Sequence, residues 1–341
     1  MTVFAKAVGY YAAACIAGAV LSSNASAHEA GDFSQYFRGV TIGDPLGAAL
    51  PAGVYFETVT LYVPEAYGHG QVGAFNASAT SEIPIVVWST GWKFLDAAVV
   101  MAKTKPYFEV NVWSTAAGPP FAAAHYPAWH NTWIDPLTLS WNFNNGWFAS
   151  VSLAFWVPDG SRYNNTPNPD YWTFEPNASI SYLAGGWNLT AHFVYDLNGA
   201  SAGHTGVFAG TPAAAFEIGY HSGDQFYVDV TATKRFGKWE FGPVGYLKSQ
   251  PTSDHPGSGF SCATMAAVAG VKCGRATDIA LGGLVGYHFD IGTLHDIGTL
   301  QIYLTDSVYT KDDFGGLFLW TKMALKLPDL VANPAPPPIH K

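Results

Sequence analysis

Apolar and polar residues alternate with a period of two through much of the chain. Between residues 172 and 183 the even positions are mostly apolar and the odd positions polar: Trp172, Phe174, Pro176, Ala178, Ile180 and Tyr182 against Thr173, Glu175, Asn177, Ser179 and Ser181. The alternation resumes after Gly185-Gly186, with Trp187, Leu189, Ala191, Phe193 and Tyr195 opposite Asn188, Thr190, His192 and Asp196. Because successive side chains of a strand point to opposite faces, these two runs predict a β-hairpin closed by a tight glycine turn.

The apolar faces carry aromatic residues at their ends and aliphatic residues between them. This banding is typical of outer-membrane strands, whose lipid-facing side has aromatic girdles at both interfaces. Residues 147–157 fit the same scheme, and so do residues 317–327, where Lys322 and Lys326 lie opposite five apolar residues. Two lysines on one side of an apolar strand require water, which inside a barrel means the lumen.

Short and long connections alternate along the chain. Short ones are expected near residues 95–98, 144–146, 184–186, 237–238 and 290–297, and long polar ones near 64–80, 114–128, 158–171, 198–212 and 250–277, with a shorter one at 310–314. Periplasmic turns in such barrels are short and outer loops are longer, and a sheet in lipid must close to leave no unpaired edge. We therefore predict an all-β, transmembrane, antiparallel up-and-down β-barrel of about twelve strands over residues 51–328.

Both ends of the chain differ from this pattern. Residues 1–27 combine Lys6, an apolar run and Ala25-Ser26-Ala27, which is the pattern of a cleaved signal peptide that exports the protein to the bacterial outer membrane. Residues 28–50 are expected to be either a periplasmic lead-in or a plug inside the barrel. Residues 329–341 are rich in proline and are expected to be a periplasmic tail.

Composition narrows the function classes. Charged residues make up 12% of the chain and aromatic residues 15%, which suits a lipid-facing surface better than a water-facing one. The net charge of −9 argues against a nucleic-acid partner. No phosphate-binding glycine loop or zinc-type ligand spacing is present in the sequence, so we expect no cofactor and no metal.

The alternation also identifies polar side chains expected to face the lumen: Glu109, Asn111, Glu175, Ser179, His192, Asp229, Arg235, Lys322 and Lys326. They could set the ion selectivity of a pore, or pair with each other and fill the barrel. His192 with Ser179, Glu175 and Asp229 has the residue types of a hydrolase. Because serines are common on inward-facing strand surfaces, we expect no catalytic residues and no enzyme.

The region expected to form the outer loops adds two features. Trp113, Phe121, Tyr126 and Trp129 could capture an aromatic permeant by stacking or contact membrane lipid and lipopolysaccharide. Cys262 and Cys273 lie in the longest loop and are expected to form a disulfide in an oxidising compartment, the alternative being two thiols.

Several stretches resemble the outer-membrane transporter family labelled for the meta-pathway of phenol degradation. They are residues 43–55 (GDPLGAALPAGVY), 157–163 (VPDGSRY), 171–176 (YWTFEP), 222–226 (SGDQF), 242–246 (GPVGY) and the end of the last strand at 324–328 (ALKLP). The resemblance implies a barrel associated with uptake of aromatic compounds. Together with the strand pattern, it leads us to expect a passive channel for small apolar or aromatic molecules. The alternative is a closed structural or surface-interaction barrel whose outer loops carry the function.

Overall fold

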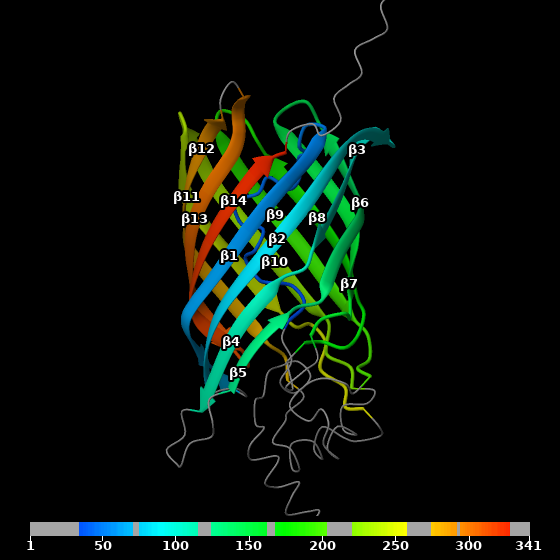
Figure 1. Ribbon diagram of the computed structural model, residues 1–341, viewed down its shortest axis with the longest axis vertical. Helices are drawn as coiled ribbons and strands as arrows, with labels where there is room; N and C mark the ends of the chain where they lie inside the picture. The colour runs from blue at the N-terminus through cyan, green and yellow to red at the C-terminus, as the bar shows by residue number, and fades with distance from the viewer. Residues whose placement is uncertain are drawn as a thin grey trace, which may run out of the picture.

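The computed structural model describes residues 34–70, 75–114, 124–161, 168–202, 220–257, 274–291 and 294–327. The signal-peptide prediction, Phe121, both loop cysteines and the proline-rich tail fall outside these residues. The described chain forms a tall barrel of tilted strands (Figure 1). Among the described residues no helix is long and apolar enough to cross a membrane.

Fourteen strand segments are described: β1 (Gly53–Gly68), β2 (Phe75–Phe94), β3 (Ala97–Thr104), β4 (Tyr107–Ser114), β5 (Ala124–Trp129), β6 (Thr132–Asn142), β7 (Trp147–Val157), β8 (Thr173–Tyr182), β9 (Trp187–Asn198), β10 (Gln225–Phe236), β11 (Trp239–Ser249), β12 (Thr277–Ile291), β13 (Leu294–Lys311) and β14 (Phe314–Lys326).

These segments make a closed barrel of twelve antiparallel strands. β2 pairs with β3 along one half of its length and with β4 along the other, so β3 and β4 are two parts of one strand. β5 and β6 likewise continue one another, because they pair with β4 and β3. The sheet closes where β1 pairs with both β2 and β14. The predicted fold class and strand number are confirmed.

The predicted hairpin corresponds to β8 and β9. Ser179 pairs with His192 and Ser181 with Thr190 across the two strands. Gly185 and Gly186 both have positive φ, of 59° and 80°. A Cβ atom on Gly186 would also lie 2.9 Å from the Arg235 carbonyl oxygen, so both backbone conformation and space favour glycine in this turn.

Turn length distinguishes the two ends of the barrel. One end has the tight turns after β2, β6, β8, β10 and β12, and the other has the long connections after β7, β9 and β11 (Figure 1). We call these the periplasmic end and the outer end, following the rule that short turns face the periplasm.

The outward surface has the expected apolar belt with aromatic ends. Trp92, Phe94, Trp147, Trp187, Phe236 and Trp239 are exposed near the periplasmic end, Tyr62, Tyr67, Trp129, Trp172 and Tyr309 near the outer end, and Val151, Leu153, Leu281, Val285, Ile302 and Leu304 between them. This arrangement places apolar side chains where they contact lipid chains and aromatic rings where they meet the headgroups.

The inside of the barrel has two chemically different walls. β8, β9 and β10 present buried polar side chains inward, among them Glu175, His192 and Asp229. β1 and β2 instead present mostly apolar side chains, including Val59 and Ile83. The lumen therefore contains a polar wall (inward residues of β8–β10) and an apolar wall (inward residues of β1–β4).

The predicted inward direction of Glu109 and Asn111 is wrong. On β4 the buried residues are Phe108, Val110 and Val112, which pack with Phe75, Ala77 and Ala128, whereas Glu109 is exposed on the outside. The outward face of β2 changes along its length, from exposed Val86 and Trp88 to exposed Thr80 and Glu82. At the outer end of these strands the outward face has left the apolar belt, so a polar residue there no longer marks the lumen.

Candidate functional site

Residues 34–50, which we call the inner segment, lie inside the barrel (Figure 1). At the outer end Gln35 donates a hydrogen bond to Thr173 at the start of β8 (3.2 Å). At the periplasmic end the Leu50 carbonyl accepts a hydrogen bond from Ser89 (2.6 Å). The inner segment thus runs the length of the lumen before β1 begins.

Turns rather than a strand shape the inner segment, and Gly39 and Gly43 have positive φ. Its backbone groups bond to the barrel: the amides of Gly43, Gly47 and Ala49 donate to Thr231 (2.8 Å), Ser181 (3.0 Å) and Ser140 (2.9 Å). The carbonyl of Leu46 accepts from Ser150 and that of Gly43 from Asn188. Inward serines, threonines and asparagine therefore satisfy an irregular backbone that has no sheet partners of its own.

Asp229 on β10 is the main polar anchor of the inner segment. Its carboxylate accepts hydrogen bonds from the Tyr36 hydroxyl (2.8 Å), the Gly39 amide (2.9 Å) and both the amide and hydroxyl of Thr41 (3.2 and 2.8 Å). The Thr41 hydroxyl also lies 3.0 Å from Nδ1 of His192. One buried carboxylate thereby holds three residues of the inner segment.

A second anchor is the fully buried Lys322 on β14. Its ammonium donates to the Ile42 carbonyl (2.9 Å) and to the Asp44 carboxylate. Glu57 on β1 lies 3.8 Å from the same nitrogen. A buried cation between two carboxylates joins the inner segment to the strands that close the barrel.

A third anchor lies at the outer end. Arg38 forms ion pairs with Asp313 (2.8 Å) and Asp278 (3.2 Å), and Lys248 lies 2.8 Å from the same Asp313 oxygen. Burial alone raises the pKa of the Asp313 carboxyl, but Arg38 and Lys248 lower it more, so the pKa lies below its usual range. Asp313 is therefore ionised at neutral pH and holds Arg38 against the rim.

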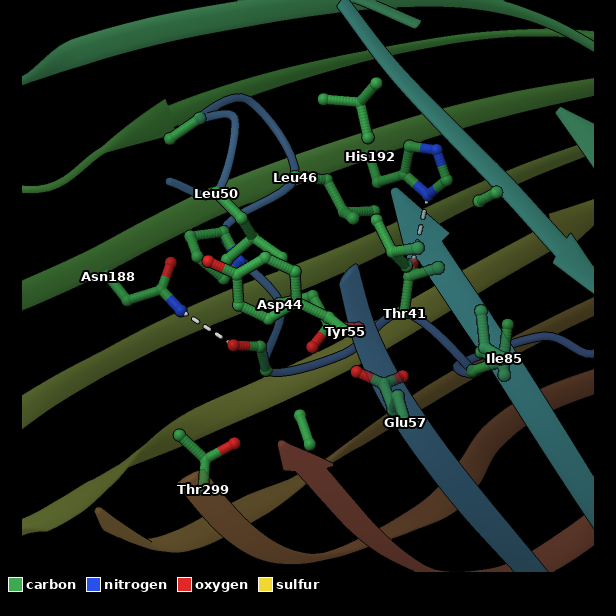
Figure 2. Close-up of a pocket in the computed structure, with 18 of the residues that line it drawn as sticks. Thr41, Asp44, Leu46, Leu50, Tyr55, Glu57, Ile85, Asn188, His192 and Thr299 are labelled. Carbon is green, nitrogen blue, oxygen red and sulfur yellow. Dashed lines mark hydrogen bonds between the residues drawn. The ribbon is translucent and has the colours of Figure 1, made fainter. Parts of the chain in front are cut away.

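Between the inner segment and the barrel wall is a cavity of about 660 Å³. Its lining is mainly apolar and includes Leu46 and Leu50 from the segment and Tyr55 and Ile85 from the wall. Figure 2 shows these side chains around the space, with Asn188, His192 and Thr299 adding polar groups at its margin. The arrangement can hold a small apolar molecule and offer it a few hydrogen bonds.

Seven of the nine residues predicted to face the lumen do point inward. Glu175, His192, Arg235 and Lys326 line the cavity. Asp229 and Lys322 hold the inner segment, and Ser179 is buried on the inward face of β8. Glu175 accepts hydrogen bonds from the indoles of Trp133 (2.8 Å) and Trp156 (2.6 Å). Most of the charged side chains among these are thus engaged with protein groups rather than exposed to an open pore.

Three of the four aromatic residues predicted for the outer loops lie on strands instead. Trp113 is on β4, and Tyr126 and Trp129 are on β5, so β5 begins within the range 114–128 that was expected to be a loop. Trp129 is exposed on the outside, where it contacts Tyr107, whereas Tyr126 packs on the inward apolar cluster. Only Tyr126 of these three is placed to meet a molecule in the lumen.

Sequence reasoning missed the residues of the inner segment that build the site, namely Thr41, Asp44, Leu46 and Leu50, and the wall residues Tyr55 and Glu57. The resemblance at residues 43–55 was the one signal that covered most of them. No group of three or more histidine, cysteine or acidic residues suited to a metal occurs among the described residues. Ser179, the hydroxyl considered for a hydrolase, donates a hydrogen bond to the Ala191 carbonyl (3.1 Å).

Comparison with known proteins gives one family match and several similar folds. The family model described as "Putative MetA-pathway of phenol degradation" matches residues 64–323. The COG4313 outer membrane channel from Pseudomonas putida F1 superposes with a TM-score of 0.62 at 12% identity, covering 84% of this chain and 98% of that one.

Two further solved structures are less similar. The translocator domain of the autotransporter NalP from Neisseria meningitidis gives a TM-score of 0.46 at 9% identity, covering 82% of this chain and 90% of the domain. The CymD monoaromatic hydrocarbon channel gives 0.38 at 8% identity, covering 86% and 95%. The sequence matches none of the curated proteins with which it was compared.

Proposed function

The chain belongs to the family described as "Putative MetA-pathway of phenol degradation", and from this premise we propose that it is an outer-membrane channel for passive passage of small apolar or aromatic molecules. The observation that carries the proposal is the cavity inside the barrel. A pore for hydrated solutes needs a polar, water-filled lumen, whereas this space is lined mainly by apolar side chains.

The size of the cavity supports the same class of permeant. About 660 Å³ falls within the roughly 300–1,000 Å³ range of pockets that hold small organic molecules. Ile85 and Leu46 provide apolar contact, and Asn188 and Thr299 can bond to one polar substituent, such as a hydroxyl group. A neutral aromatic ring with a single hydroxyl group matches this lining.

The inner segment sets how open the channel is. Anchored at Arg38, Asp229 and Lys322, the segment fills much of the lumen. This filling also favours the alternative function, a closed structural barrel. The two functions differ in one property: a channel lets the permeant reach the periplasm, whereas a closed barrel does not.

The test is to measure solute uptake by cells that have an intact outer membrane and express this protein in it. Initial uptake of radiolabelled benzyl alcohol should rise several-fold above that of cells without the protein, whereas uptake of xylose should change little. The reason is that an apolar lining accepts the ring but does not replace the hydration of a sugar.

Ala102→Trp provides a variant in which the cavity is filled, because Ala102 lines the cavity from β3. Val86→Trp is its matched control, since Val86 is exposed on the lipid-facing side of β2. Benzyl alcohol uptake should fall to background in the first variant and persist in the second. Equal uptake in cells with and without the protein would favour the closed barrel.

A further inference from the structure

Four aromatic side chains meet at the outer limit of the cavity. The ring of His130 lies 5.3 Å from that of Phe37 at an interplanar angle of 89°, 5.8 Å from Phe108 at 70°, and 5.3 Å from Trp156 at 55°. Phe37 and Trp156 line the cavity. We call these four residues the aromatic cluster.

The aromatic cluster lies where two strands of the barrel are interrupted. Lys105 and Pro106 separate β3 from β4, and His130 and Asn131 separate β5 from β6. The His130 amide donates to the Pro106 carbonyl (2.8 Å), so the two interruptions face each other. His130 comes two residues after the inward-facing Ala128, so it follows the alternation of β5 into the lumen, at the height of the two interruptions.

Hydrogen bonds and burial hold the wall side of the aromatic cluster in place. Nδ1 of His130 lies 2.8 Å from the Asn168 side-chain oxygen and Nε2 lies 3.3 Å from the Gln35 carbonyl, so the ring is held at both edges. Trp156 is held by its hydrogen bond to Glu175. Both rings, and that of Phe108, are almost fully buried.

Phe37 is different because it comes from the inner segment and is only partly buried. Its ring contacts His130 edge to face, and no polar atom of its side chain ties it in place. It also packs against the buried apolar cluster of β1 and β14, but as a partly exposed side chain it can change rotamer more readily than the fully buried rings. Phe37 is therefore the member of the aromatic cluster best placed to move without unfolding the barrel wall.

The two sides of the aromatic cluster are both apolar. The cavity lies towards the periplasm. A packed apolar group lies towards the outer end, where Phe75, Val110 and Val112 contact Phe108. Phe108 belongs to both the outer group and the aromatic cluster. The rings thus form a short aromatic barrier between two apolar regions of the same lumen.

We propose that the aromatic cluster is the selectivity constriction of the channel, in which Phe37 closes against His130, Phe108 and Trp156. A flat neutral ring passes by displacing Phe37 and making, in its place, the edge or face contacts with the other three rings. A hydrated ion or a sugar finds no group there that replaces its water. The passage of solutes through this constriction rests on the proposed function. Closure of the lumen by Phe37 can be measured separately.

The experiment is single-channel recording of the purified full chain in planar bilayers with KCl. Phe37→Ala should raise the conductance several-fold above wild type, while staying below that of a variant that lacks residues 34–48. Phe37→Leu should give a smaller rise, because it keeps most of the apolar bulk. Phe174→Ala is the matched control, since Phe174 faces lipid on β8, and it should conduct like the wild type.

Phe108→Ala tests the fixed side of the constriction without touching the inner segment, and it should also raise the conductance. Wild-type conductance in both alanine variants would overturn the proposal. Conductance of Phe37→Ala equal to that of the deletion variant would overturn it too, since Phe37 would then retain the segment rather than close the path. Failure of the proposed function alone would give a different result. Benzyl alcohol uptake would be absent, while the variants would still change the KCl conductance.

Discussion

Deletion of residues 34–48 should convert the barrel into a wide pore, with a KCl conductance roughly tenfold above that of the wild type. The reason is that the inner segment runs the length of a twelve-stranded lumen and is the element that separates the polar wall from the apolar wall. The closing contacts of the barrel, between β1 and its neighbours β2 and β14, do not include these residues. The deletion variant should therefore still fold as a barrel.

The measurement is single-channel recording, with the heat-modifiable migration of folded barrels in gels as the check on folding. A synthetic peptide of residues 34–50 should reduce the conductance of the deletion variant, because Asp229, Lys322 and Ser181 remain available to bind it. A peptide of the same composition in scrambled order is the control. Unchanged conductance in a folded deletion variant would show that the inner segment does not occupy the conducting path.

Lys322→Met should cost the largest amount of stability among single substitutions at the site. Lys322 is almost completely buried, and its removal leaves Asp44 and Glu57 facing each other without a cation. Breaking a buried ion pair by removing one partner costs about 3–5 kcal/mol, since the remaining charge stays desolvated. We expect the free energy of unfolding in urea to fall by about this amount.

Two further variants separate the loss of charge from the loss of packing. Adding Asp44→Asn and Glu57→Gln to Lys322→Met should recover most of the lost stability, because no unpaired charge is then buried. Lys326→Met is the matched control at the periplasmic mouth, where the side chain is partly exposed, and it should stay within about 0.5 kcal/mol of the wild type. Equal destabilisation by Lys322→Met and Lys326→Met would contradict the role assigned to Lys322.

The barrel could be predicted from sequence because its strands obey one strong rule. In β8 and β9 every second residue faces lipid, so the alternation identified the strands, the turn at Gly185-Gly186 and the inward direction of His192. The rule depends on lipid outside and water inside. It failed at Glu109, where the strand has passed beyond the apolar belt and the inward side is apolar.

The site was harder to predict because the inner segment has no period. Turns at Gly39 and Gly43 place Thr41 and Asp44 against strands far away in the chain, and no local pattern specifies those partners. Lys322 was predicted to face water from its position opposite apolar residues. Its partners, Asp44 and the Ile42 carbonyl, depend on the tertiary fold of the inner segment. The sequence pattern did not decide whether that segment lies inside or outside the barrel.

The most direct test of the cavity as a permeant site is the crystal structure of the wild-type protein soaked with 4-iodophenol, using the anomalous signal of iodine to locate the ring. We expect an iodine peak within the cavity, among Leu46, Tyr55 and Ile85, and its loss in Ala102→Trp. Iodine found only on the lipid-facing surface, with ordered water filling the cavity of the wild type, would contradict the claim that this space receives an apolar permeant.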